Sequence, residues 1–296
     1  MRKTLFVLVE LVLFVVLLAA CSILITVTAL PAWAILALIF VAFAAWLLFV
    51  AILVTIPKDS RAYNNRGLAR ARKGDLDGAI ADYDRAIRLD PKCGTAYLNR
   101  GLARAQKGDL AGAIPDYDCA IELDPADIAA YFGRGTTRAE EGNWADAIAD
   151  YSRAIEIRPD FAAAYFGRAA VHAKEGYGAG AVADYSRTIE VDPGFGPAYA
   201  ERGFARAEEG DLAGAIADYD EAIRFLPTDP EKALVYARRA RAHAAMGDVP
   251  AACESLATAI ALDPQWRDLT RAEPQFDPIR HEPCFQALIA GPSTSL

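Results

Sequence analysis

The sequence has few residues of the kinds that build metal or redox centres. Its five cysteines, Cys21, Cys93, Cys119, Cys253 and Cys284, contain no C-x-x-C pair and follow no regular spacing, and the chain has three histidines. A disulfide framework and a zinc site both depend on such patterns. We therefore expect reduced, mostly buried thiols and no metal site.

Catalytic signatures are missing as well. The chain has no G-x-S-x-G, no Walker-type loop, no H-E-x-x-H and no dinucleotide fingerprint. D-Y-D triplets recur, as at residues 82–84, but their carboxylates alternate around a helix and do not converge on one point. We predict no enzyme activity, no catalytic residue and no small-molecule cofactor.

Positive charge is in deficit. The chain has 31 Lys and Arg against 39 Asp and Glu, a net charge of −8. Arg2, Lys3 and Glu10 are the charged residues of the first 56, so everything after them is still more acidic. Because binding to phosphate backbones needs a basic surface, nucleic acid is excluded as the main partner.

Apolar residues, by contrast, fill residues 4–56 almost without interruption. One bilayer crossing takes about 20 apolar residues, so this segment is long enough for two. Pro31 marks the break between them, because proline cannot continue a helix. We predict a transmembrane segment over 1–56 with spans at about 5–27 and 33–55, in contact with lipid through 5–55, and a linker at 57–59.

Basic residues predict the orientation of these spans. Arg2 and Lys3 precede the first span, Lys58 and Arg61 follow the second, and the turn between them is uncharged. Positive residues stay on the cytoplasmic side. We expect a multi-pass protein of the bacterial inner membrane whose residues from 57 onward lie in the cytoplasm. Ala37, Ala44 and Ala51 share one face of the second span and allow close helix approach, including self-association.

An alternative comes from Leu18-Ala19-Ala20-Cys21, which follows Arg2, Lys3 and an apolar stretch. This pattern resembles a bacterial lipoprotein signal with a lipidated cysteine. The apolar run that continues after Ser22 favours the two spans instead. Even with a lipid on Cys21, a second span would return the chain to the cytoplasm.

After residue 60 the sequence repeats itself. The motif G-D-x-x-x-A-I-x-D-Y, with variants, begins at Gly74, Gly108, Gly142, Gly176, Gly210 and, most divergent, Gly247. The first five glycines are 34 residues apart, and the sixth follows after 37 because residues 228–231 lengthen one connection. A 34-residue period is typical of paired helices stacked into a solenoid.

The pattern resembles the tetratricopeptide repeat. Each copy has an aromatic residue followed four residues later by a small one, then the turn glycine, an alanine, a second aromatic in five copies, and a closing proline; the first copy shows these at Tyr63, Gly67, Gly74, Ala79, Tyr83 and Pro91. The resemblance implies an all-α, right-handed superhelical solenoid. Units 1 to 6 would span 60–93, 94–127, 128–161, 162–195, 196–229 and 233–266.

The turn positions have physical reasons. Glycine can take the left-handed conformation that ends the first helix of a unit. The residue after it can cap the second helix through its side-chain oxygen, and these residues are Asp75, Asp109, Asn143, Asp211 and Asp248. Unit 4 has Tyr177 there, with Gly178 and Gly180 close behind.

Charged residues recur inside the helices. One arginine precedes the small residue in every unit, and one aspartate precedes the second aromatic in units 1 to 5. We predict that each aspartate pairs with the arginine of the following unit, for example Asp150 with Arg168; solvated, unpaired charges are the alternative. His172 and His243 stand where the other units have arginine, and we expect exposed helix residues there.

Residues 267–290 resemble the closing segment of such arrays. We expect a capping helix from Leu269, with Phe276, Ile279, Phe285 and Leu288 packed beneath it, and a disordered tail over 291–296.

The resemblance also implies a function. In this family the first helices line a concave groove that binds a protein or peptide. The expected groove residues here are Asn64, Leu68, Leu98, Leu102, Phe132, Thr136, Phe166 and Phe204. We therefore expect a membrane-tethered scaffold or adaptor without catalysis. The alternative is a lipoprotein-like factor, lipidated at Cys21, in assembly of the cell envelope.

Overall fold

The structure is a computed structural model, and it describes residues 40–41, 43–44 and 59–290. The chain divides into two units, Met1–Lys58 and Asp59–Leu296. Among the described residues, no helix is both long and apolar enough to cross a bilayer. The predicted spans, apart from four helical residues at 40–41 and 43–44, lie outside the described residues, as do Cys21 and the predicted tail.

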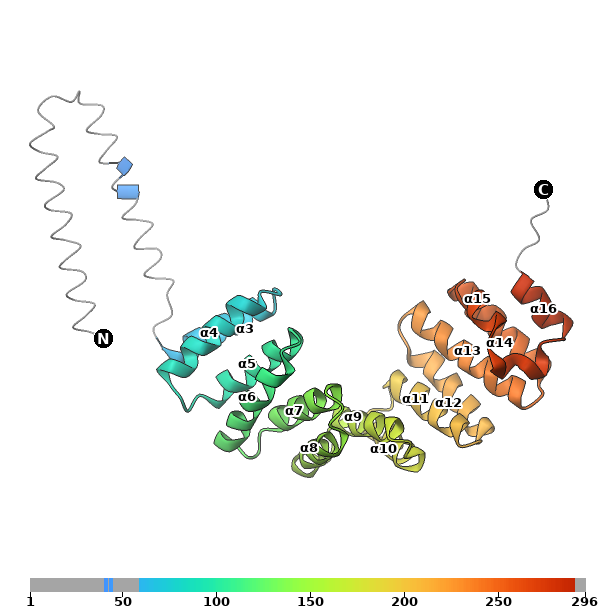
Figure 1. The fold of residues 1–296 in the computed structure, drawn as a ribbon, viewed down its shortest axis with the longest axis horizontal. Helices are drawn as coiled ribbons and strands as arrows, with labels where there is room; N and C mark the ends of the chain where they lie inside the picture. Colours follow the sequence, from blue (N-terminus) through green and yellow to red (C-terminus); the bar gives the residue numbers. More distant parts are fainter. Residues whose placement is uncertain (1–39, 42, 45–58, 291–296) are drawn as a thin grey trace, which may run out of the picture. The chain divides into compact units, whose positions relative to one another are not determined.

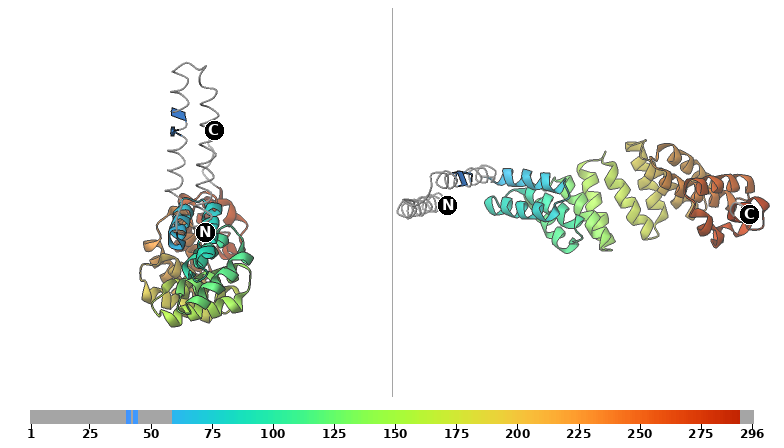
Figure 2. Two further views of the ribbon diagram at one scale, coloured as in Figure 1. Left: turned by 90° about the vertical axis from the view of Figure 1, so that its left-hand side faces the viewer. Right: turned by 90° about the horizontal axis from the view of Figure 1, so that it is seen from above.

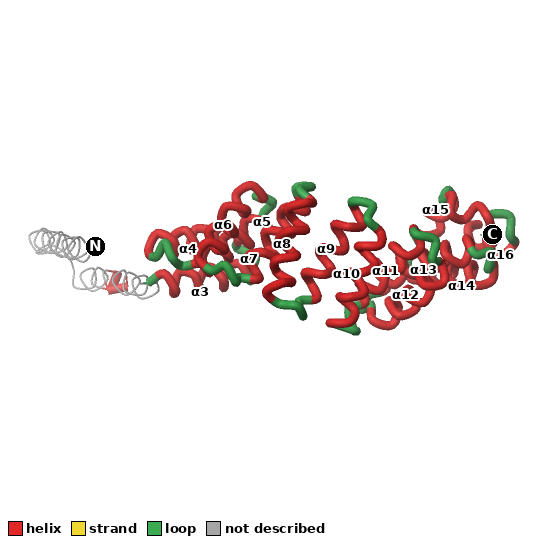
Figure 3. Tube along the Cα trace, turned by 90° about the horizontal axis from the view of Figure 1, so that it is seen from below, coloured by secondary structure: helices red, strands yellow, loops and turns green. Residues whose placement is uncertain are grey.

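Residues 59–290 form helices and loops without a strand, as Figure 3 shows. Six helical hairpins follow one another in chain order (Figure 1). They are α3 (Ser60–Ala71) with α4 (Leu76–Leu89), α5 (Gly94–Gln106) with α6 (Leu110–Leu123), α7 (Ile128–Glu140) with α8 (Trp144–Ile157), α9 (Ala162–Lys174) with α10 (Gly178–Val191), α11 (Gly196–Glu208) with α12 (Leu212–Phe225), and α13 (Asp229–Ala245) with α14 (Val249–Leu262). The all-helical solenoid is therefore confirmed.

Successive hairpins pack directly on each other. The second helix of each unit contacts the first helix of the next, and first helices of neighbouring units also touch, as α3 touches α5 and α5 touches α7. The first helices therefore lie on the inner side of the stack, and Figure 2 shows the stack from two further sides, coloured in chain order. We call their exposed surface the inner face.

The turns inside the hairpins have the predicted geometry. All six turn glycines have positive φ, between 77° and 87°. The side chain of Asp75 accepts a hydrogen bond from the Gly78 amide at 2.9 Å, and the aspartates of units 2, 5 and 6 cap their helices in the same way. Asn143 was expected to cap α8 but does not, because its side-chain amide donates to Asp146 instead.

Small residues let the helices of one hairpin approach closely. A Cβ atom added to Gly101 would lie 2.9 Å from a ring carbon of Tyr117, and one added to Gly203 would lie 2.8 Å from Tyr219. Both tyrosines are fully buried. Each ring therefore occupies the space that the missing side chain leaves.

The extra residues before unit 6 lengthen a helix. We expected residues 228–231 to lengthen a connection, but α13 begins at Asp229 and has 17 residues, where α11 has 13. Pro230 lies in the first turn, where a helix does not need its amide. The insertion therefore adds a turn of helix at the start of α13.

The predicted arginine–aspartate pairing is wrong in direction. Asp150 accepts hydrogen bonds from Arg134 of its own unit, at 3.0 Å from Nε and 2.6 Å from Nη2, and not from Arg168 of the next. The same two-point contact joins residues 16 apart in units 1, 2, 4 and 5, so Arg66 does have a partner, Asp82. In unit 6, Ser255 takes the place of the aspartate.

The third guanidinium nitrogen makes the contact between units. Nη1 of Arg134 donates to Asp118 of unit 2 at 2.5 Å, and Nη1 of Arg168 donates to Ser152 of unit 3 at 2.8 Å. In each case the acceptor lies two residues after the aspartate predicted to pair with that arginine, as Asp118 follows Asp116. One arginine thus bonds the second helix of its own unit and that of the unit before it.

A capping segment closes the end of the stack. It consists of α15 (Trp266–Arg271), the 3₁₀ helix η2 (Pro274–Ile279) and α16 (Pro283–Ala290). Phe276, Ile279 and Phe285 are fully buried against α13 and α14, as expected, and Leu288 packs beside them. The cap does not begin at Leu269, whose side chain is exposed.

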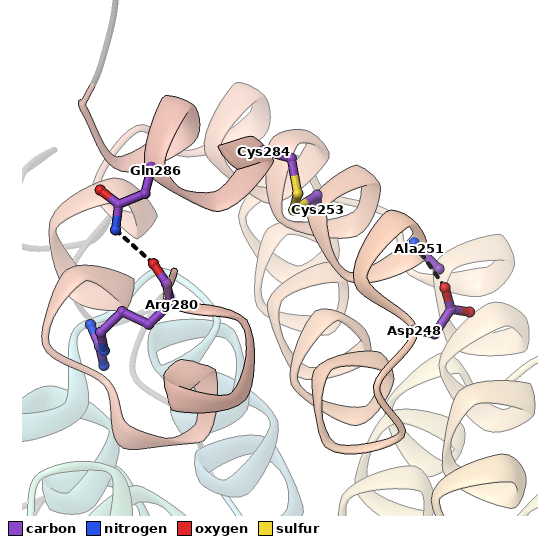
Figure 4. The surroundings of a disulfide bond; sticks show 6 residues. All are labelled: Asp248, Ala251, Cys253, Arg280, Cys284 and Gln286. Atoms are coloured by element: carbon purple, nitrogen blue, oxygen red, sulfur yellow. Dashed lines mark hydrogen bonds between the residues drawn. A yellow bond between two sulfur atoms is a disulfide. The ribbon is translucent and has the colours of Figure 1, made fainter. Parts of the chain in front are cut away.

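A disulfide joins this cap to unit 6, contrary to the expectation of reduced thiols. Cys253 of α14 is bonded to Cys284 of α16, with their Cα atoms 6.1 Å apart (Figure 4). Cys93 and Cys119 are free. The two bonded cysteines are 31 residues apart in the sequence, and only the fold of the cap brings them together.

Replacing Cys284 with serine should lower the stability of the cap by about 2 kcal/mol, because the bond limits the freedom of the unfolded segment. Amide exchange in α16 measures the change. Wild type treated with a phosphine reductant should match the variant, and the variant should not respond to the reductant. An unchanged exchange rate in reduced wild type would contradict a stabilising disulfide at this position.

Candidate functional site

The eight predicted groove residues lie at different depths of the inner face. Leu102 is 39% exposed and Phe204 is 37% exposed. Leu68, Leu98, Phe132, Thr136 and Phe166 are half-buried. Asn64 is buried, and its carbonyl oxygen accepts a hydrogen bond from the Asn99 amide at 3.0 Å, so it joins α3 to α5.

Phe132 and Phe166 occupy equivalent positions and pack in the same way. The ring centroid of Phe132 lies 5.7 Å from that of Tyr151 and 5.3 Å from that of Phe161. Phe166 contacts Tyr185 and Phe195 at similar distances. Phe161 and Phe195 were missed from the sequence, although they are 34 residues apart and each directly precedes a first helix.

One cavity, which we call cavity A, opens between α7, α8 and α9. Its volume is about 160 Å³, and its lining includes Thr136, Glu140, Tyr151, Phe166 and Lys174. The Tyr151 hydroxyl donates to Thr136 Oγ1 at 3.2 Å. Burial raises the pKa of Tyr151, so this side chain stays neutral. Cavity A is therefore largely apolar, with charge confined to the exposed residues Glu140 and Lys174.

A larger cavity, cavity B, lies between α11, α12, α13 and η2. Its volume is about 350 Å³, and its lining includes Phe204, Glu208, Tyr219, Arg238 and Arg241. Burial raises the pKa of Tyr219 to about 12, so the ring is again neutral. Pro274 and Pro278 of the cap complete the wall, so the capping segment closes this end of the inner face.

The arginines of cavity B are already engaged. Arg238 bonds Glu201 at 2.8 Å, and its guanidinium lies 4.7 Å from the ring centroid of Phe204. Arg241 is paired with Glu273 of the cap. Glu208 is exposed at the end of α11, and no ion pair or hydrogen bond to its side chain is present within residues 59–290.

Cavities A and B are built alike, two units apart. Glu140 and Glu208 hold the same position in their units, as do Tyr151 and Tyr219. Thr136 of cavity A corresponds to Phe204 of cavity B. The repeat therefore produces two mostly apolar hollows on the inner face, each with a glutamate in its lining.

His172 and His243 each lie near a carboxylate. His172 was expected to be exposed, but only 18% of its side chain is, and its Nε2 lies 3.7 Å from Asp184. His243 is likewise less exposed than expected, at 17% of its side chain, and its Nδ1 lies 3.4 Å from Asp248. Both take the place of an arginine that faces a carboxylate in other units, as Arg138 faces Asp150. No cluster that could hold a metal ion is found in the part of the chain that the structure describes.

Comparison with known proteins agrees with this architecture. One tetratricopeptide repeat model matches residues 42–92, 64–128 and 174–230, and a second matches 135–176. Together they span more than half of the chain. Among curated proteins, no sequence matches significantly.

Solved structures show the same fold. MamA is 28% identical, with 53% of this chain and 92% of MamA covered and a TM-score of 0.51. YrrB, described as a TPR protein with an unusual peptide-binding site, is 22% identical, with coverages of 62% and 92% and a TM-score of 0.54. PilW, a type IV pilus biogenesis factor, is 20% identical, with coverages of 74% and 97% and a TM-score of 0.60. From its repeats and its fold, the chain belongs to the tetratricopeptide repeat family.

Proposed function

We propose that this protein is a scaffold that binds a protein or peptide segment on its inner face, without catalysis of its own. The observation that carries the proposal is the pair of corresponding, mostly apolar cavities on that face, with the exposed side chain of Phe204 in the lining of cavity B. Hollows of this kind take the apolar anchors of a partner, which supply most of the binding energy in such interfaces. YrrB, a solved member of the fold, has a peptide-binding site.

The apolar residues 5–55 give the scaffold its second role in this proposal, as a tether in the inner membrane with the repeats on the cytoplasmic side. Tethering raises the local concentration of a partner that is also at the membrane, without any new contact. The tether supplies no chemistry to the groove.

The disulfide favours a second candidate. Disulfides persist in oxidising compartments and are rare in the cytoplasm, and Cys253 is bonded to Cys284. In this candidate the repeats lie outside the cytoplasm, Cys21 carries a lipid, and the protein is a factor in cell-envelope assembly. It differs from the sequence-based alternative, in which a second span at 33–55 returns the chain to the cytoplasm. Mass spectrometry of Cys21 separates the two candidates, because only the second has a diacylglyceryl adduct.

Binding on the inner face is tested by photo-crosslinking in membranes. A benzophenone amino acid replacing Phe204 should capture a specific partner, because this side chain is exposed beside cavity B. The control is the same residue at Leu123, which is as exposed but ends a second helix. Equal products from both positions would contradict a binding role for the inner face.

A further inference from the structure

We infer that the inner face of units 3 to 6 selects a cationic–apolar segment, meaning one that carries lysine or arginine beside aliphatic or aromatic anchors. The inference rests on the proposed function and names the chemistry of its partner. It is based on the charged side chains of the inner face that form no ion pair within residues 59–290.

The cations of the first helices are almost all neutralised by the fold. Arg134 and Arg138 are bonded to Asp150, and Arg202 and Arg206 to Asp218. The arginines of cavity B are paired with Glu201 and with Glu273. These guanidiniums hold the hairpins together and present little net charge to a partner.

The carboxylates at the cavities, by contrast, form no ion pair within residues 59–290. Glu140 ends α7 and Glu208 ends α11, both are exposed, and within residues 59–290 neither takes part in an ion pair. Glu141, Glu175 and Glu209 follow in the adjoining turns and are exposed as well. Lys174 is the opposing charge at cavity A, so the edge of units 3 to 5 has a clear acidic excess.

The arrangement matches a segment with two apolar anchors. One anchor enters cavity A and the other enters cavity B, whose volume is about twice as large. A cationic side chain next to each anchor then faces Glu140 or Glu208. Complementary charge of this kind acts mainly on selectivity and on the rate of association, and its effect falls as salt is added.

The test uses the full chain in lipid nanodiscs and a phage library of random 12-residue peptides. Peptides enriched on wild type should contain several times more Lys and Arg than Asp and Glu, next to apolar residues. The variant Glu140→Lys/Glu208→Lys should lose this preference and enrich acidic peptides. A synthetic peptide from the wild-type selection should bind the variant roughly tenfold more weakly, as measured by fluorescence anisotropy.

Three further variants separate the possible failures. Glu122→Lys/Glu254→Lys changes the net charge equally on exposed positions of second helices and should bind as wild type does. Ala139→Trp/Ala207→Trp fills both cavities, with Ala149→Trp on the outer helix α8 as its control. Enrichment of neutral or acidic peptides that depends on the cavities would overturn the charge selectivity and leave the proposed function standing. Enrichment no better on wild type than on the filled variant would overturn both.

Discussion

Replacement of Asp150 by alanine is expected to lower the free energy of unfolding of residues 57–296 by about 3 kcal/mol. The Asp150 side chain is 4% exposed and accepts hydrogen bonds from Arg134 and, at 2.7 Å, from Arg138. Its removal leaves two guanidinium groups, 15% and 20% exposed, without their main acceptor. The cost of an unpaired, poorly hydrated charge exceeds the loss of an ordinary surface contact.

Urea denaturation followed by circular dichroism measures the loss. Asp118→Ala is the matched control, because Asp118 also bonds Arg134 but its side chain is 44% exposed, and its loss should cost less than about 1 kcal/mol. A double-mutant cycle between Asp150 and Arg168 should give a coupling energy near zero, since these residues do not bond each other. A strong Asp150–Arg168 coupling would restore the pairing that the structure contradicts.

The second large effect is expected in the cap. Phe285→Ala should destabilise the end of the stack by about 4 kcal/mol, because the ring is fully buried and its removal leaves a cavity. Its centroid lies 5.6 Å from that of Phe276, so both rings lose packing. In a solenoid each unit depends on its neighbour, and unit 6 has only the cap on its outer side.

Hydrogen exchange shows which helices lose stability in this variant. Protection should decrease in α14 and α16, with units 1 and 2 unchanged. Leu269→Ala is the control, because this leucine of α15 is 56% exposed, and it should cost less than about 0.5 kcal/mol. Uniform loss of protection along the whole array would contradict the local effect.

The solenoid could be predicted from the sequence because each repeated residue has a local reason for its place. The glycine at 108 ends one helix through its positive φ, and Asp109 caps the next through its carboxylate. Such signals act within a few residues, so the helix bounds follow from them. The exceptions are also local, since the Asn143 amide donates to Asp146 and does not cap α8.

Contacts between residues far apart in the sequence could not be predicted from such local signals. In a 34-residue repeat, Asp150 is 16 residues after one arginine and 18 before the next, and sequence spacing does not decide between them. The disulfide between Cys253 and Cys284 depends on how α16 folds back on α14, which no spacing rule describes. The two cavities likewise need three or four helices each, so their volumes and free carboxylates appear only in the folded chain.

The arginine that bonds two second helices at once affects how the number of repeat units can change during evolution. Because Arg134 contacts Asp150 in its own unit and Asp118 in the preceding one, each of units 1 to 5 carries both halves of the connection, the arginine and the acceptor. Duplication of a single 34-residue segment in the gene therefore supplies a new joint that already fits. The binding surface can grow or shrink by whole units during evolution, while the cap at the far end remains as it is.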